Sequence, residues 1–217
     1  MQAAEARKLV CAAVGRLFEP AGFAYRKSDE AFVKPFVGGR HAVYLGFWSY
    51  PPCHVFSLTP AVRIDRIEEL YNEISNAPAR YRQKTVSLVV QLWRLAGQEK
   101  PAHDVPLPGW GSPFYYTFSS EHDMSAAIDS VTPVVRELIL PFSDQYRDIA
   151  SVNRAINHEG LDTGDGRILH GIIAAHLAKD STYMDILSRY HKGMQAWPAN
   201  DRDLFDRAVE YLAAHPA

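Results

Sequence analysis

Cysteine is scarce in this sequence, with only Cys11 and Cys53 among 217 residues. The two form no CxxC pair and are too few for a disulfide framework, so a disulfide-stabilised secreted domain is not expected. Isolated thiols are typical of a reducing compartment, and we predict a cytoplasmic protein. The opening residues, MQAAEARKLV, place charged side chains where a signal peptide would be apolar, and no apolar run is long enough to cross a bilayer. We therefore expect a soluble protein without a membrane partner.

Motifs for catalysis and cofactor binding are also missing. The sequence contains no GxGxxG, P-loop, GxSxG, HExxH or CxxC. No two of the nine histidines stand three or four residues apart, the spacing that brings two imidazoles to one face of a helix for zinc. We predict no metal, no cofactor and no catalytic residues. The question of catalysis stays open, but the pattern favours a protein that is not an enzyme.

Basic charge is too weak for a nucleic-acid-binding protein. Residues 1–108 contain 14 Lys and Arg against 10 Asp and Glu, an excess of +4, whereas residues 109–217 contain 9 against 15, an excess of −6. Nucleic-acid-binding proteins concentrate positive charge far more heavily, so no nucleic acid is expected. The acidic second part instead favours association with a basic protein, because complementary charge steers encounter.

The stretch from Arg40 to Asp65 organises the rest of the chain. Successive side chains of a strand point to opposite sides, and here the two sides differ in composition. One side collects apolar residues: Val43, Leu45, Phe47, Phe56, Leu58, Val62 and Ile64. The other collects aromatic, hydroxyl and basic residues: Tyr44, Trp48, Tyr50, Ser57, Thr59 and Arg63. The pattern predicts a β-hairpin with one core face and one aromatic-polar face.

The flanking sequence predicts helices and further strands. Apolar residues recur at helical spacing in residues 3–20 and 65–74, and residues 23–36 are typical of a short hairpin. Residues 86–95 alternate once more and predict a strand, with Ser87, Gln91 and Trp93 on its polar side. After Ser120 only helical patterns occur.

These elements predict an α+β fold. We expect a mixed, mainly antiparallel sheet with helices packed on one face, followed by a C-terminal helical region. Residues 1–160 would form the α+β domain and residues 161–217 the helical region packed on it, and a single domain overall is the alternative. The sequence does not indicate an oligomeric state.

The aromatic-polar face is the candidate ligand-binding site. Its predicted centre is Tyr44, Trp48, Arg63, Gln91 and Trp93, and the Pro- and Gly-rich loop that carries Trp110 would close over it. Large aromatic side chains are not left bare, since burying one contributes about 1.5–3 kcal/mol. Either the chain's own helices cover this face, which is the commoner arrangement of layers, or a ligand or partner does.

Two segments resemble an uncharacterised bacterial family, the domain-of-unknown-function family 4304. They are LFEPAGFAYRKSDEAFVKPF and VVRELILPFSDQYRDIASVNRAI. In that family a helix ends at a Pro-x-Gly-Phe turn before a short hairpin, and the resemblance covers roughly residues 5–156. It implies a role like that of the immunity proteins of bacterial toxin systems, which neutralise a partner by binding it, and it implies no catalytic residues.

Two functions therefore stay open. The preferred hypothesis is a non-catalytic, immunity-like protein that binds a basic, toxin-like protein through an acidic helical surface or the aromatic-polar face. The alternative is a small-molecule-binding protein, or an enzyme without a known motif, with its pocket on the aromatic-polar face.

Overall fold

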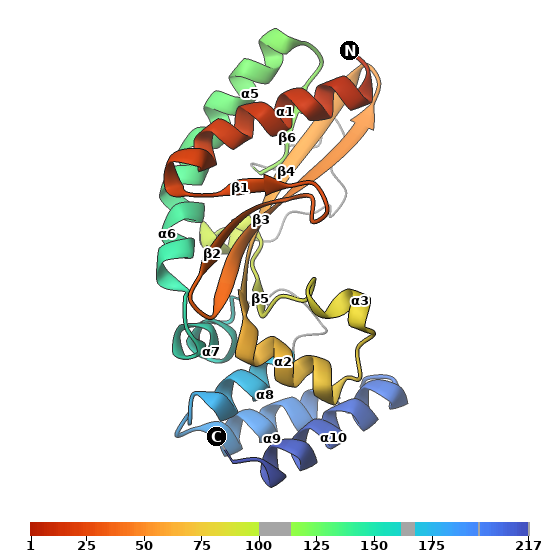
Figure 1. Ribbon diagram of the computed structural model, residues 1–217, viewed down its shortest axis with the longest axis vertical. Helices are drawn as coiled ribbons and strands as arrows, with labels where there is room; N and C mark the ends of the chain where they lie inside the picture. The colour runs from red at the N-terminus through yellow and green to blue at the C-terminus, as the bar shows by residue number, and fades with distance from the viewer. Residues whose placement is uncertain (100–113, 162–167, 195, 217) are drawn as a thin grey trace. The chain divides into compact units, whose positions relative to one another are not determined.

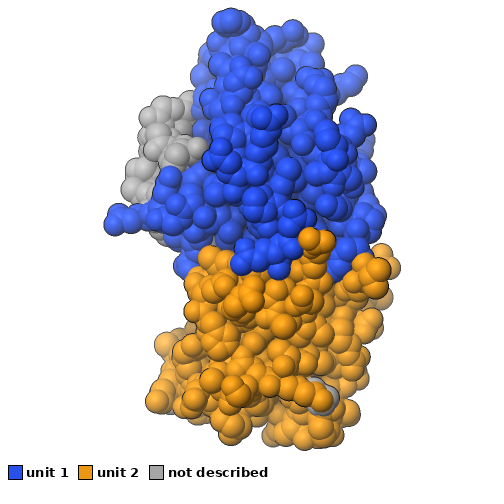
Figure 2. Space-filling model, turned by 90° about the vertical axis from the view of Figure 1, so that its left-hand side faces the viewer, with its two compact units in different colours: residues 1–36, 40–61, 90–145 blue, residues 37–39, 62–89, 146–217 orange. Residues whose placement is uncertain are grey.

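The computed structural model describes residues 1–99, 114–161, 168–194 and 196–216. The chain divides into two compact units (Figure 2). Unit 1 consists of residues 1–36, 40–61 and 90–145, and unit 2 of residues 37–39, 62–89 and 146–217. This division differs from the predicted boundary at residue 160, because unit 2 takes residues 62–89 from the middle of the chain.

The described residues form one six-stranded sheet in the order β1-β2-β3-β4-β5, with β6 paired to β4 (Figure 1). Its strands are β1 (Ala24–Arg26), β2 (Ala31–Phe36), β3 (Gly39–Tyr50), β4 (Cys53–Ile64), β5 (Leu88–Val89) and β6 (Tyr116–Phe118). The pairs β1–β2 and β4–β6 are antiparallel. The predicted α+β class is confirmed, and the central β3–β4 ribbon occupies the stretch in which alternation was predicted.

The helical segments of unit 1 pack on one face of its strands. They are α1 (Ala3–Phe18), the 3-10 turn η1 (Glu19–Ala21), α4 (Leu92–Leu95), α5 (Glu121–Val134), the π-helical η2 (Val135–Ile139) and α6 (Leu140–Gln145). Gly22 follows η1 with a φ of 84°, a left-handed conformation that glycine adopts without strain. Near the end of α5, Pro133 lacks the backbone N–H that an α-helix needs, and the chain passes into the wider π-helical turn directly after it.

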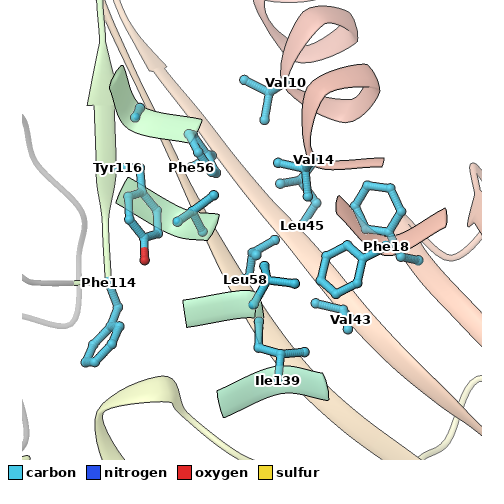
Figure 3. Close-up of a cluster of buried hydrophobic side chains, with 14 of the residues drawn as sticks. Val10, Val14, Phe18, Val43, Leu45, Phe56, Leu58, Phe114, Tyr116 and Ile139 are labelled. Atoms are coloured by element: carbon cyan, nitrogen blue, oxygen red, sulfur yellow. The ribbon is translucent and has the colours of Figure 1, made fainter. Parts of the chain in front are cut away.

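The main core of unit 1 lies between these helices and the sheet (Figure 3). Val10, Val14 and Phe18 of α1 meet Val43 and Leu45 of β3. Phe56 and Leu58 of β4, Tyr116 of β6 and Ile139 of η2 complete the same cluster. Tyr44 packs instead against a second cluster of strand residues, Ala31, Val33 and Ala42. The prediction that Val43 and Tyr44 face different environments is confirmed.

Tyr116 brings an unsatisfied polar group into this core. Its side chain is 6% exposed, and its hydroxyl has no hydrogen-bond partner among the described residues. Burial raises the pKa of the Tyr116 phenol to about 12. A buried hydroxyl without a partner costs about 1–3 kcal/mol.

We expect Tyr116→Phe to stabilise the protein by about 1 kcal/mol at neutral pH, because it removes this hydroxyl. Because the folded state raises the pKa of Tyr116, the stability that its neutral phenol contributes is complete below pH about 10 and is lost as the pH rises toward about 12. The free energy of unfolding of Tyr116→Phe should therefore exceed that of the wild type by a growing amount over that range. Denaturant titrations at pH 7 and 11 measure both effects. Tyr81→Phe, at an exposed position, is the control and should change neither value. A loss of stability in Tyr116→Phe at both pH values would contradict the prediction.

Unit 2 is mostly helical. Its described helices are α2 (Asp65–Ile74), α3 (Ala79–Arg82), α7 (Ile149–Asn157), α8 (Ile168–Leu177), α9 (Tyr183–Met194) and α10 (Ala199–Ala214). The centre is α8, which contacts α2, α7, α9 and α10 (Figure 1). Its sequence, ILHGIIAAHL, is apolar nearly all round, as expected for a helix with neighbours on several sides.

The predicted strand over residues 86–95 is largely wrong. Only Leu88 and Val89 form a strand, and Leu92–Leu95 turn into the short helix α4. Val86, Leu88, Val90 and Leu92 are nevertheless all buried, as the alternation indicated. Alternation identified these four buried side chains but not Ser87, which was assigned to the polar side and is also buried. A run of this length does not by itself distinguish a strand from an extended segment followed by a helical turn.

Candidate functional site

Tyr44 and Trp48 share the side of β3 that faces away from the main core. Between them lies Gly46, and a Cβ added there would stand 2.5 Å from Cη2 of Trp48 and 2.9 Å from Oγ of Ser57. The indole therefore lies close over the glycine backbone. The ring of Tyr115 meets Trp48 edge-on, with centroids 6.2 Å apart. We name the half-buried rings of Trp48 and Tyr115 the aromatic patch. Tyr44 lies four residues earlier on the same side of β3 and packs against Ala31, Val33 and Ala42.

Arg63 is not part of this patch. It belongs to unit 2, where its Nε donates to Oδ1 of Asp65 at 2.7 Å. Its Nη1 donates to the carbonyl oxygens of Arg82 and Thr85, both at 2.9 Å, and to the Thr85 hydroxyl at 3.0 Å. The side chain is buried, and these bonds tie the end of β4 to the segment that follows α3. We assign Arg63 a structural role.

Two other predicted site residues, Gln91 and Trp93, lie at α4. Trp93 lies in α4 and packs half-buried against the main core, on the helix side of the sheet. Gln91 is exposed directly before α4. Trp110 lies outside the described residues. The structure thus places two of the six predicted residues, Tyr44 and Trp48, on one side of β3, and it pairs Trp48 with Tyr115, which the sequence did not single out.

A second candidate surface is acidic and lies on the outer side of α5, η2 and α6. The inner side of this continuous helix buries Val131, Val135 and Ile139 in the main core. The solvent-exposed positions of this helix include five carboxylates, and we name them the acidic face: Glu121, Asp123, Asp129, Glu137 and Asp144. The exposed Arg136 is the single Lys or Arg in this helix, which also contains the exposed His122. Charge asymmetry predicted an acidic second part of the chain, but not that much of it would gather on one helix.

Asp123 of the acidic face has a local structural role. Its carboxylate accepts from the backbone N–H of Ser119 at 3.3 Å, and its own N–H donates to the Ser120 hydroxyl at 3.2 Å. Hydrogen bonding by Ser120, and then by the Ser119 backbone, lowers the pKa of Asp123. This reciprocal arrangement caps the start of α5. By contrast, Asp129 and Glu137 form no ion pair with any residue that the structure describes.

Unit 2 contains a fully buried carboxylate at Glu68. Its Oε1 accepts from the Ser87 hydroxyl at 2.7 Å and lies 3.2 Å from Nε2 of His170, which is itself 5% exposed. Burial would raise the pKa of Glu68, but the contact and charge of His170, and then the hydroxyls of Thr85 and Ser87, outweigh it and lower the pKa to about 2. Ser87 bonds to the carboxylate and not to the imidazole, so this is no Ser-His-acid relay. The group ties α2 to α8.

A further polar cluster joins α7, α8 and α9. Asn157 donates through Nδ2 to Oδ1 of Asn153 at 2.7 Å and to the carbonyl of Gly171 at 2.9 Å, and its Oδ1 accepts from the Tyr190 hydroxyl at 2.6 Å. Gly171 allows the close approach, because a Cβ there would stand 2.6 Å from the Tyr190 oxygen. All polar atoms of the Asn157 side chain are engaged, so its role is to hold the helices together.

Asp180 accepts hydrogen bonds beside this cluster. Nε2 of His158 lies 2.7 Å from its Oδ2, Asn153 donates to the same oxygen, and Thr182 donates to Oδ1 through both its backbone and its hydroxyl. The His158 contact is the main cause that holds the pKa of Asp180 well below its usual range. Since Thr182 directly precedes α9, the carboxylate acts as a helix cap, a structural role.

A cavity of about 140 Å³ opens in unit 2 near α2, α8 and α10. Aromatic side chains of Tyr71, Trp197 and Phe205 line it together with Leu169, Leu204 and Asp201. Sequence analysis did not identify it, because its residues come from distant segments and carry no motif.

Within the described residues no helix is both long and apolar enough to cross a bilayer. Among the same residues no group of three His, Cys, Asp or Glu side chains is placed to hold a metal ion.

Comparison with known proteins finds no family model, no curated protein and no solved structure that matches the chain. The resemblance to family 4304 and the functions inferred from it stay predictions.

Proposed function

We propose that this protein is a non-catalytic binding protein, immunity-like in role, which recognises a basic protein through its acidic face. The observation that carries the proposal is the composition of one continuous helix, from α5 through η2 to α6. Its inner side is anchored in the core of unit 1, and its solvent-exposed positions present five carboxylates against one guanidinium. A negatively charged surface on a helix that is anchored in the core suits a positively charged partner.

An ordinary solvated helix has a different pattern, and α10 provides the comparison. There Arg202 stands four residues before Asp206, and Asp203 four residues before Arg207, so opposite charges are neighbours on the helix surface. Two carboxylates of the acidic face, Asp129 and Glu137, lack such compensation, because neither has an ion-pair partner among the described residues. Like charges held on one side repel each other, and a basic partner would relieve that repulsion.

The test is charge reversal of the acidic face at two positions away from its helix cap. We expect Asp129→Lys combined with Glu137→Lys to weaken binding to the basic partner at least about tenfold, because attraction becomes repulsion. The partner is the protein that co-purifies in stoichiometric amount from the native host at low ionic strength. Its identity by mass spectrometry and its affinity by calorimetry are the measurements.

Asp203→Lys combined with Glu210→Lys is the matched control. It makes the same change in net charge at exposed positions of α10, and it should leave binding unchanged. Equal losses in both double variants would mean that net charge alone matters and would count against the acidic face. Failure of the native host to provide any stoichiometric basic protein would count against the function itself.

A further inference from the structure

The described walls of the cavity in unit 2 are apolar and aromatic, apart from one charged side chain. Three aromatic residues, Tyr71, Trp197 and Phe205, line it with Leu169 and Leu204. Its volume of about 140 Å³ is close to that of an engineered apolar cavity that accepts benzene, about 150 Å³. The space therefore suits a molecule with one aromatic ring.

The single charged group among the described lining residues is the carboxylate of Asp201, in the first turn of α10. It forms no ion pair and accepts no side-chain hydrogen bond from any other described residue. In contrast, the buried carboxylate of Glu68 and that of Asp180 are both engaged. No described residue therefore competes with a ligand for the charge of Asp201.

Aromatic faces and a carboxylate attract the same kind of group. An organic cation is drawn to the negative face of an indole or phenol ring and to a carboxylate, whereas an anion is repelled by both. The wall at Tyr71 is held in place from behind, because its ring stacks on His170 with centroids 4.1 Å apart. His170 in turn lies 3.2 Å from Glu68. This part of the cavity is consequently fixed by buried contacts.

We propose that this cavity binds a small monocyclic aromatic amine in its ammonium form, with the ring among Tyr71, Trp197 and Phe205 and the charge at Asp201. The site is separate from the acidic face: its described lining belongs to unit 2, and that face belongs to unit 1. Its ligand is a small molecule, in addition to the protein partner proposed above.

The experiment uses the full chain and three probes of similar size: 2-phenylethylammonium, neutral 2-phenylethanol and anionic phenylacetate. Titration calorimetry should give saturable binding of the ammonium probe, at least about tenfold tighter than the alcohol, and no binding of the anion. Asp201→Asn should remove the preference for the ammonium probe. Leu204→Phe, which fills the cavity, should abolish binding of the ammonium probe and the alcohol.

Asp203→Asn is the matched control on the same helix, at an exposed position that does not line the cavity, and it should bind like the wild type. Absence of saturable binding of 2-phenylethylammonium to the wild type would overturn the proposal. Equal affinity for the ammonium probe and the alcohol would overturn it too, since the cavity would then be selective for apolar groups alone. The Asp129→Lys, Glu137→Lys variant should bind the ammonium probe normally, so failure of one proposal is distinguishable from failure of the other.

Discussion

Lowering the pH from about 4.5 to about 2 should reduce the free energy of unfolding of the wild-type protein by about 3 kcal/mol. A Glu68→Gln variant should not show this loss. The folded state lowers the pKa of Glu68 to about 2, so its ionised form contributes stability above the unfolded pKa of about 4.5. That contribution is lost as the pH falls through the folded pKa. Denaturant titrations at several pH values between 2 and 7 measure the difference between the two proteins.

The physical reason for this effect is the buried group around Glu68. In Glu68→Gln the neutral amide no longer pairs with His170, and we expect a loss of about 3 kcal/mol at neutral pH. Glu69→Gln is the control, because Glu69 is exposed and lies 3.7 Å from an equally exposed Arg66. It should change stability by less than about 0.5 kcal/mol at any pH. Parallel acid curves for wild type and Glu68→Gln would show that the carboxylate does not titrate as described.

Replacing Asn157 by alanine should destabilise the protein by about 3 kcal/mol or more. The change leaves the Gly171 carbonyl, Oδ1 of Asn153 and the Tyr190 hydroxyl each without the bond that Asn157 provides. Each polar group that loses its partner in a buried setting costs about 1–3 kcal/mol. Thermal and denaturant unfolding measure the loss, and Asn200→Ala, at an exposed position of α10, should stay within about 0.5 kcal/mol of the wild type.

A double-mutant cycle makes this prediction specific. Tyr190→Phe removes the same bond to Oδ1 of Asn157 from the other side. The losses of Asn157→Ala and Tyr190→Phe should therefore add to more than the loss of the double variant, with a coupling of about 1 kcal/mol. Strict additivity would mean that the two side chains do not depend on each other.

Local alternation predicted the side of β3 on which each residue lies. Val43 and Leu45 are in the main core, and Tyr44 and Trp48 are on the opposite side, because the strand period is set by backbone geometry alone. The same rule did not predict the surroundings of Arg63. It stands on the predicted side of β4, but β4 passes from unit 1 into unit 2, and alternation says nothing about which unit a residue enters.

Trp93 was misplaced for a different reason. Trp93 was predicted on the polar side of a strand, and this prediction required residues 86–95 to form one continuous strand. The chain instead turns into α4, which places the indole against the main core. Burial of an aromatic side chain in that core outweighed the strand pattern. The pair Glu68 and His170 was beyond prediction, since the two residues are far apart in sequence and meet only because α2 packs on α8.

The acidic face was predicted in part. The excess of Asp and Glu after residue 109 and the helical patterns after Ser120 were both visible in the sequence. The apolar spacing also predicted one helix that continues past Pro133 with a kink at most, and α5, η2 and α6 do follow one another without a break.

The central claim is that the acidic face meets a basic protein, and the rate of association tests it most directly. The measurement is the association rate constant of the co-purifying basic partner with the wild type and with the Asp129→Lys, Glu137→Lys variant, across a range of salt concentrations. We predict that the wild-type rate is at least about tenfold higher at low salt and falls steeply as salt is added, while the variant rate rises slightly or stays flat. Equal rates with the same salt dependence would contradict the claim.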